Sequence, residues 1–537
     1  MDTITQCCTD AVAFSYRSID RLVLNAYIPT LQTPAAMAVF FREVQHRPIL
    51  AGKVFKALTD RFVTQVTRFA KTKGIPVFRP TGRTRPGEVA QKALKVAARA
   101  NRWGVVAIVV HQESARVFAS YHAGGRATNY RVKEDRRLIN HYYFYFRDRA
   151  YGDGFVRISS YPPFQTRIWM NAHGYLAAQL RRRRIAFRAD ENCIVEVSKP
   201  PVLQEVADEF DAALVETIAR KWMSVVPDPL TSEERAAGYP TCLSVYQAEF
   251  CDNVVFHRTQ VLNRMYEQLL RDHLHFGRLD MVKIMFDRRI TKRTPSRFQT
   301  RVLRQGVVSC LKVFYKKSFL KQYNKGGRVL RTEVCINDPG DFGVRKSLVH
   351  LGYLGTIAHH ALTRFSKAQA VALSTALDRS TFERIIMPSE HGGKRVAGIR
   401  FGAPGSMRVL EALGCAGLCF RAFSNADLRG VLVERLGAAA QEVTPGHIGY
   451  QLRKLRGKGL VRKVKGRNLY TLTDLGYRVT IYFTKLHQRL LTPPLNTFDT
   501  ALASALGTSV HPMDRALQSL NAKLDTLAQL CRLEIAA

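Results

Sequence analysis

Apolar residues in the first quarter of the chain follow two alternating spacings. Short runs rich in β-branched residues are typical of strands, whereas longer segments with apolar residues three or four positions apart are typical of helices. The pattern predicts strands at 21–29, 74–80 and 104–111, and helices within 34–71 and 86–101. This order is typical of an α/β layer, whose strands can be parallel.

The next segment combines aromatic strands with a basic helix. An aromatic strand at 141–148 is followed by a glycine turn at 152–154 and a short strand at 155–158, so these strands are predicted to form a hairpin. A strand at 167–170 leads to Asn171, which is expected to cap the helix that follows. That helix ends in a basic cluster of Arg181, Arg182, Arg183 and Arg184.

The region before the C-terminus predicts two helices and a hairpin. Ser424 can cap a helix over 425–436, and Thr444, followed by proline, can cap a second helix. Two short strands at 460–464 and 469–473 then flank a basic turn. Two helices followed by a basic-tipped hairpin are the pattern of a winged helix-turn-helix, which commonly docks on DNA.

The pattern as a whole predicts a multidomain protein of α/β and α+β class. A final amphipathic helix over 512–535 carries five leucines on one face, which would suit a homo-oligomer contact. The leucines are Leu517, Leu520, Leu524, Leu527 and Leu530. The predicted domains are an α/β domain (1–125), an aromatic hairpin with the basic helix (126–200), a helical segment (201–275), a basic strand-rich nucleic-acid-binding unit (276–345), a helical connector (346–395), the winged helix (396–495) and the C-terminal helix (496–537).

The net charge of the chain indicates what kind of partner it binds. The 537 residues include 82 lysines and arginines against 43 aspartates and glutamates, which leaves a formal net charge of +39. Positive residues occur along the whole chain, with dense clusters at 181–184, 288–304 and 312–325. A long phosphate-binding surface has such a distribution, because each neutralised phosphate releases counterions. We therefore expect a nucleic-acid partner, with duplex DNA first and structured RNA as the alternative.

The cysteine spacing and the hydropathy of the chain indicate the cellular compartment to expect. The ten cysteines have no zinc-finger spacing, so they are expected to be reduced thiols of a cytosolic protein. The N-terminus lacks the pattern of a signal peptide, and no apolar run approaches the roughly 18 residues of a membrane helix. We expect a cytoplasmic, nucleoid-associated protein without a membrane partner.

In the predicted winged helix, three side chains should project from the second helix toward DNA. These are Gln451, Arg453 and Lys454. Lys465 and Arg467, at the hairpin turn, should meet phosphates.

The central strand-rich unit offers a second candidate site. In a strand, Arg331 and Glu333 share one face. Basic groups there could hold a nucleic-acid backbone while Tyr323 stacks on bases and Glu333 takes a metal ion or a proton. The alternative is an Arg–Glu pair that only orders a positive surface. The basic residues of this candidate channel are Lys321, Lys325, Arg328 and Arg331.

The same residues resemble a known pattern. Lys321-Gln-Tyr323-Asn-Lys325 followed by Leu330-Arg331-Thr-Glu333 is similar to strands of HUH-class rolling-circle replication initiators. The resemblance implies that Tyr323 is a nucleophile and that His273 and His275 hold a divalent metal, Mg²⁺ or Mn²⁺. The alternative is that both histidines end a helix, where residues two apart do not face one another.

Three carboxylates form a further candidate centre. Asp20 begins the first predicted strand, Glu113 follows the strand at 104–111, and Asp148 ends the strand at 141–148. Carboxylates on neighbouring strands resemble the layout of RNase H-like nucleases, which bind two metal ions for attack at a phosphate. Strand-end carboxylates are also common as turn caps.

The chain lacks a Walker A motif, a Gly-x-Gly-x-x-Gly turn and a Gly-x-Ser-x-Gly elbow, which argues against nucleotide hydrolysis and dinucleotide chemistry. The segments at 20–29, 143–148, 171–176 and 330–339 are together similar to a large family of basic bacterial proteins with a C-terminal winged helix and the multicopy distribution of mobile-element genes. The resemblance implies a mobile-element protein that binds DNA, RNA or both, and that cleaves or joins strands with metal help if it is an enzyme. The alternative is a non-enzymatic DNA-binding regulator or an RNA-binding component of a ribonucleoprotein.

Overall fold

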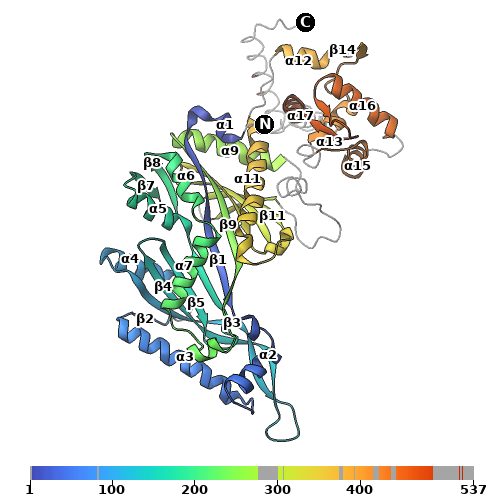
Figure 1. Cartoon of the computed structure of the whole chain (residues 1–537). Helices are drawn as coiled ribbons and strands as arrows, with labels where there is room; N and C mark the ends of the chain where they lie inside the picture. Colours follow the sequence, from blue (N-terminus) through green and yellow to red (C-terminus); the bar gives the residue numbers. More distant parts are fainter. Residues whose placement is uncertain are drawn as a thin grey trace, which may run out of the picture. The chain divides into compact units, whose positions relative to one another are not determined.

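The computed structural model describes most of the chain as two compact units, residues 2–367 and, together with Met1, residues 368–537 (Figure 1). The described residues are 3–80, 84–190, 192–275, 300–305, 308–373, 379–391, 393–414, 422–436 and 443–487, together with residues 519 and 523. The first part of the predicted basic unit (276–299) and nearly all of the predicted final helix (512–535) lie outside them.

One large sheet organises the first unit, in the order β10-β11-β12-β13-β9-β1-β6-β5-β4-β3-β2. All of its pairs are antiparallel except β2 with β3. The strands are β1 (Val12–Tyr27), β2 (Val77–Phe78), β3 (Gly104–His122), β4 (Tyr130–Asp148), β5 (Gly152–Ser159), β6 (Thr166–Met170), β9 (Cys242–Phe256), β10 (Thr300–Gln305), β11 (Val308–Tyr315), β12 (Ser318–Lys325) and β13 (Val329–Ile336).

The sheet runs through the domain boundaries expected at 125, 200 and 275. β9 causes this continuity, because it pairs with β1 on one side and β13 on the other. The prediction that residues 201–275 are mainly helical was wrong for 242–256, which form β9. Ten of the fifteen residues of β9 are buried, because the strand is paired on both sides, so its local spacing does not distinguish a strand from a helix. Parallel pairing, expected for the N-terminal layer, occurs only at β2 and β3.

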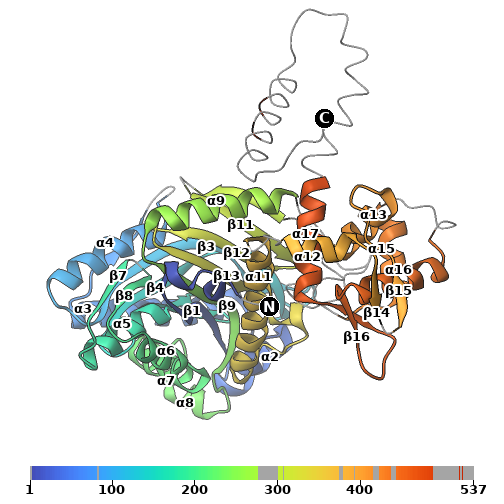
Figure 2. The same ribbon diagram turned by 90° about the horizontal axis from the view of Figure 1, so that it is seen from above.

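Helices cover parts of both faces of this sheet (Figure 2). On one face Phe62 of α3 packs edge-on against Tyr142, and Trp222 of α7 stacks on Phe146. On the other face α4 packs against Tyr145. The helices and the small hairpin of this unit are α1 (Ile4–Cys7), α2 (Pro34–Val39), α3 (Gly52–Lys73), α4 (Pro86–Arg99), α5 (Ala172–Arg182), β7 (Phe187–Asp190), β8 (Cys193–Val197), α6 (Pro200–Asp208), α7 (Ala212–Val225), α8 (Ser232–Ala236), α9 (Thr259–His275) and α11 (Leu351–Leu373).

The second unit contains the elements expected from the capping residues. Ser424 Oγ accepts a hydrogen bond from the Asp427 backbone N–H at 3.1 Å, and Thr444 Oγ1 accepts one from His447 at 3.2 Å. Its core includes Phe423 and Leu452. The elements are α12 (Arg379–Ile386), β14 (Ser389–His391), β15 (Lys394–Val396), α13 (Pro404–Gly414), α15 (Asn425–Leu436), α16 (Pro445–Gly457), β16 (Val461–Lys463), β17 (Tyr470–Leu472) and α17 (Asp474–Leu486).

The architecture is therefore a mixed α/β and α+β protein, as expected. Among the described residues, no helix is long and apolar enough to cross a membrane.

Candidate functional site

The predicted central site is a buried ionic cluster. Arg331 and Glu333 share a face of β13, as expected, but both side chains are fully buried, with 0% exposure. Arg331 Nε lies 2.6 Å from Glu333 Oε1, and Arg331 Nη2 lies 2.6 Å from Asp20 Oδ1 on β1. Arg331 Nη1 donates to the Asn192 carbonyl at 2.7 Å. Arg331 therefore presents no surface to a phosphate, which corrects its expected role as a nucleic-acid contact.

The neighbouring strand β12 completes the contacts of Glu333. Lys321 is directly opposite Glu333 in the sheet, and its Nζ lies 2.6 Å from Glu333 Oε2. The Tyr323 hydroxyl donates to Glu333 Oε1 at 2.8 Å. Lys325 Nζ donates to Asn192 Oδ1 at 2.5 Å. Three residues predicted for the channel, Lys321, Tyr323 and Arg331, thus surround the Glu333 carboxylate rather than line an open groove.

Tyr323 is a hydrogen-bond donor in this cluster. Burial, followed by the negative charge of Glu333, raises the pKa of Tyr323 above its usual value, so the hydroxyl stays protonated. It lies on strand β12, whereas the replication-initiator resemblance implies a tyrosine on a helix. His273 and His275 form the end of helix α9, which matches the helical alternative rather than a metal-binding strand, and their side chains lie outside the described residues.

His173 is a member of the cluster that the sequence pattern missed. Asn171 caps α5, as expected, by accepting from the His173 backbone N–H at 2.8 Å. The ring is 4% exposed, and its Nε2 lies 3.1 Å from Arg331 Nη2 and 3.4 Å from Asp20 Oδ1. Burial and then the Arg331 guanidinium hold the pKa of His173 well below its usual value. The neutral ring accepts from Arg331. The signal available in the sequence was an Asn-x-His pair at a helix start.

A metal ion fits this cluster poorly. Among the described residues, Glu249, Glu333 and Cys335 place potential ligand atoms within 4.8 Å of one another. Mg²⁺ and Mn²⁺ prefer oxygen ligands, and a thiol is not such a ligand. Lys321 already holds Glu333. Carboxylates and cations are also balanced here: Asp20, Glu249 and Glu333 face Arg21, Lys321 and Arg331.

The three carboxylates of the nuclease-like layout lie apart. β1, which carries Asp20, and β3, which carries Glu113, are separated by β6, β5 and β4. At roughly 4.8 Å per strand this corresponds to about 19 Å, whereas two catalytic metal ions lie only about 4 Å apart. Both strands are longer than expected, so Asp20 and Glu113 lie within strands rather than at their ends.

Each of these carboxylates already has a cationic partner. Glu113 Oε2 accepts from Arg157 at 2.9 Å, and Asp148, which ends β4 as expected, lies 2.6 Å from Lys221 Nζ. The Trp222 indole also donates to Asp148 at 3.0 Å.

The predicted basic residues divide into exposed and paired groups. Arg181 to Arg184 are exposed at the end of α5, although Arg183 pairs with Glu209. Arg328 is half-buried and donates to the Phe256 carbonyl at 3.0 Å.

In the second unit, α16 buries one face and exposes the other. Ile448, Leu452 and Leu455 lie in the core, whereas Arg453 and Arg456 are exposed. The half-exposed Gln451 contacts His447 at 3.0 Å. The hairpin-turn residues Lys465 and Arg467 are exposed.

The surroundings of Lys454 are strongly positive. Burial lowers the pKa of Lys454, and the charges of Arg400 and Lys458 lower it further. Lys458 is buried and donates to the Arg384 carbonyl at 3.1 Å. A lysine whose charge is opposed by its neighbours is stabilised when an anion binds nearby.

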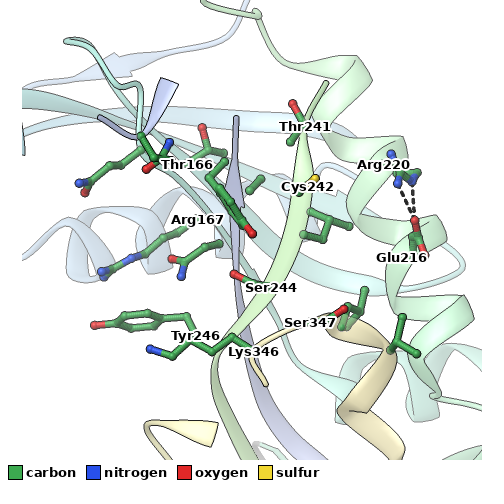
Figure 3. A pocket seen from close by; sticks show the side chains of 18 residues that line it. Thr166, Arg167, Glu216, Arg220, Thr241, Cys242, Ser244, Tyr246, Lys346 and Ser347 are labelled. Carbon is green, nitrogen blue, oxygen red and sulfur yellow. Dashed lines mark hydrogen bonds and ion pairs between the residues drawn. The ribbon is translucent and has the colours of Figure 1, made fainter. Parts of the chain in front are cut away.

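The sheet of the first unit also holds a polar cavity that the sequence analysis missed. The cavity has a volume of about 700 Å³ and lies among β1, β6, β9, α7 and the segment before α11. Figure 3 shows Arg167, Tyr246 and Lys346 on one side of it, with Glu216 and Arg220 on α7 across from them. The Arg167 guanidinium lies 3.8 Å from the centre of the Tyr246 ring.

The buried His141 on β4 predicts a loss of stability in acid. Burial and then Arg157 lower the pKa of His141 to about 4, although Glu113 opposes them. The pKa of His359 is also lowered to about 4, chiefly by burial. Below its usual pKa each histidine takes up a proton in the unfolded chain but not in the folded one, so stability falls as the pH drops from about 6.5 toward 4.

His141→Gln should remove the part of this pH dependence that His141 causes and leave the part that His359 causes. Between about pH 7 and pH 5 the parent should lose roughly 2 kcal/mol more stability than the variant. Urea unfolding at both pH values measures the difference. Asp252 acts in the opposite direction, because burial raises its pKa to about 6, but it is common to both chains and cancels. Equal pH dependence of the two proteins would contradict the assignment to His141.

No family model and no curated protein matches the chain. Among solved structures, the chain is similar to a rolling circle replication initiator protein from Geobacillus stearothermophilus, at 8% sequence identity and a TM-score of 0.17. The match covers 71% of this chain and 89% of that chain. A similarity at this level carries no inference about fold or activity.

Proposed function

We propose that this protein binds nucleic acid and docks on duplex DNA through a winged helix made of α15, α16 and the β16–β17 hairpin. One observation carries the proposal: residues 443–473 contain eight lysines and arginines and no aspartate or glutamate. These residues are Arg453, Lys454, Arg456, Lys458, Arg462, Lys463, Lys465 and Arg467.

The local fold supports a DNA contact. The apolar side of α16 packs in the core, which leaves Arg453 and Arg456 on the outer side. The hairpin adds the exposed Arg462, Lys463, Lys465 and Arg467. Within the described residues none of these six side chains lies within salt-bridge distance of a carboxylate, so their charge is available to phosphates.

Of the two functions predicted from the sequence, the geometry supports better the non-enzymatic one, a DNA-binding regulator. Asp20, Glu113, Asp148 and Glu333 are each held by a lysine or arginine of the protein. A metal ion would have to displace those cations before any of the carboxylates could serve strand cleavage.

Replacing Gln451, Arg453 and Lys454 together with alanine tests the DNA contact. Affinity for a short fluorescent duplex should fall by about tenfold or more, because base and phosphate contacts from one helix are lost, at roughly 1–3 kcal/mol for each base-reading pair. Fluorescence anisotropy measures the affinity. As a matched control, Lys71→Ala with Lys73→Ala removes the same charge from the exposed end of α3.

The control should bind duplex almost as the parent does. If instead the α16 variant binds like the parent, or both variants lose affinity equally, α16 is not the docking helix and the second unit serves another partner.

A further inference from the structure

One face of the sheet in the first unit is half open around β5 and β6. Val156 and Ile168 point to the opposite face and are fully buried, with 0% exposure. Phe155, Arg167 and Trp169 alternate with them and are partly exposed. In a strand this alternation separates two faces, so the partly exposed side chains share one surface.

Aromatic rings form a row on this face. Tyr145, Phe155 and Trp169 are directly opposite one another on β4, β5 and β6. The Phe155 and Trp169 rings are almost parallel, at 3° and 5.8 Å between centres. Tyr143 lies next to this row, 5.5 Å from Phe155. Tyr145 is only 6% exposed and packs with Tyr143 and Phe155 against α4, so Trp169 forms the open end of this row.

A polar and basic row runs beside the aromatic one. Tyr143, Arg157, Arg167 and Asn25 are neighbours across β4, β5, β6 and β1. Arg157 is buried and held by Glu113. Arg167 is different, because within the described part of the chain it has no carboxylate at salt-bridge distance, and it stacks on the Tyr246 ring.

Two cavities adjoin this face, and the first of them is bounded on its far side by α7. The first, shown in Figure 3, contains Arg167, Tyr246 and Lys346. The second has a volume of about 640 Å³ and is lined by the aromatic row, including Phe155 and Trp169, and by a group of arginines. These arginines are Arg147, Arg149 and Arg181. Asp148 and Asp153 also line the second cavity, so its three arginines exceed its carboxylates by one, and the lining at each end of the strip has a net positive charge.

We propose that this face binds single-stranded nucleic acid, with bases stacked on Trp169 and on Tyr246, which is 40% exposed, and phosphates held by the arginines at the two ends of the strip. Bases stack on aromatic side chains only when they are unpaired, which favours a single strand over a duplex. The positive ends of the strip complement a polyanion rather than a neutral or basic partner.

This site is separate from α16, so it does not depend on the proposed duplex contact. It also differs from the channel expected at Arg331, because its aromatic and basic side chains are partly exposed, whereas Arg331 is fully buried.

Two substitutions on the strip test the proposal in the full chain. Arg167→Gln and Tyr246→Ala should each weaken binding to fluorescent oligo(dT) by about fivefold or more, since stacking on one ring contributes roughly 1–3 kcal/mol per base. Duplex affinity, measured in parallel by anisotropy, should stay unchanged. The controls are Arg126→Gln, in the β3–β4 turn, and Tyr353→Ala, on α11, where the side chain is 57% exposed.

A conservative variant separates binding from unfolding. Oligo(dT) should quench tryptophan fluorescence of the parent, whereas Trp169→Phe should retain the affinity, because a ring remains, and lose most of the quenching. The α16 variant should show the reverse pattern of the strip variants, with duplex binding weakened and oligo(dT) binding kept.

The outcomes are distinguishable. Oligo(dT) affinity that is absent in the parent, or unchanged in both strip variants, overturns the single-strand site even when duplex binding responds to α16. Failure of the α16 test alone leaves this site standing and removes only the duplex contact.

Discussion

Replacing Arg331 with alanine should lower the free energy of unfolding of the first unit by about 3–5 kcal/mol. The guanidinium lies between the carboxylates of Glu333 and Asp20, at 2.6 Å from each, and all three side chains are buried. Removing Arg331 leaves two buried carboxylates without their shared cation, in surroundings that solvate charge poorly. The free energy of leaving these charges uncompensated is larger than the net contribution of the ion pairs to stability.

Urea unfolding followed by tryptophan fluorescence measures this effect in the intact chain. The chain has three tryptophans, Trp103, Trp169 and Trp222, all within the first unit, so the signal reports on that unit. Lys317→Ala is the matched control: it breaks an ion pair with Asp338, but its side chain is 72% exposed. Exposed pairs contribute about 1 kcal/mol or less, so the control should be close to the parent.

Glu333→Gln distinguishes a structural cluster from a nucleic-acid channel. In a channel, removing the negative charge would leave binding intact or improve it without loss of stability. In the buried cluster, the variant should lose stability, because Lys321 and Arg331 lose their shared partner. A variant as stable as the parent, or an Arg331→Ala change below about 1 kcal/mol, would contradict the structural role.

Local signals in the sequence were sufficient for α15, α16 and the β16–β17 hairpin of the second unit. Ser424 and Thr444 cap α15 and α16 through hydrogen bonds within three residues, and the three apolar positions of α16 follow a helical spacing. Capping and amphipathic spacing act over a few residues, so a single sequence carries them.

Pairing between distant strands could not be predicted in the same way. The shared face of Arg331 and Glu333 follows from strand geometry alone, but their burial depends on β9, which was expected to be helical. With β9 misassigned, nothing linked β1 and β13 as the strands on either side of it, and Asp20 was assigned to a different site from Arg331. Register across a sheet is fixed by contacts between segments far apart in the chain, which no window of the sequence contains.

The aromatic strip shows the same limit. The strand of Tyr143 and Tyr145 and the strand of Trp169 were both predicted, but their alignment through β5 required the observed register. The sequence identified the side chains, and only the sheet showed that they share a face with Arg167.

The affinity for duplex DNA should fall steeply with salt. Six exposed lysines and arginines on α16 and the hairpin would give a slope of log affinity against log salt of about −5, at roughly −0.9 per phosphate contact. Between about 50 and 200 mM salt this corresponds to about a thousandfold loss of affinity. The six residues are Arg453, Arg456, Arg462, Lys463, Lys465 and Arg467.

The hairpin provides the decisive variant for this prediction. Lys465→Ala with Arg467→Ala should reduce the magnitude of the slope by about 2, since each phosphate contact contributes about 1, and should weaken binding to all duplex sequences alike. The Lys71→Ala, Lys73→Ala control removes the same net charge from α3 and should leave the slope unchanged, because those lysines are not expected to touch DNA. Anisotropy titrations across a salt series measure the slope for the parent, the hairpin variant and the α3 control. An affinity that does not change with salt would exclude a phosphate-dominated contact, and an equal change in both variants would show that net charge, rather than the hairpin, sets the slope.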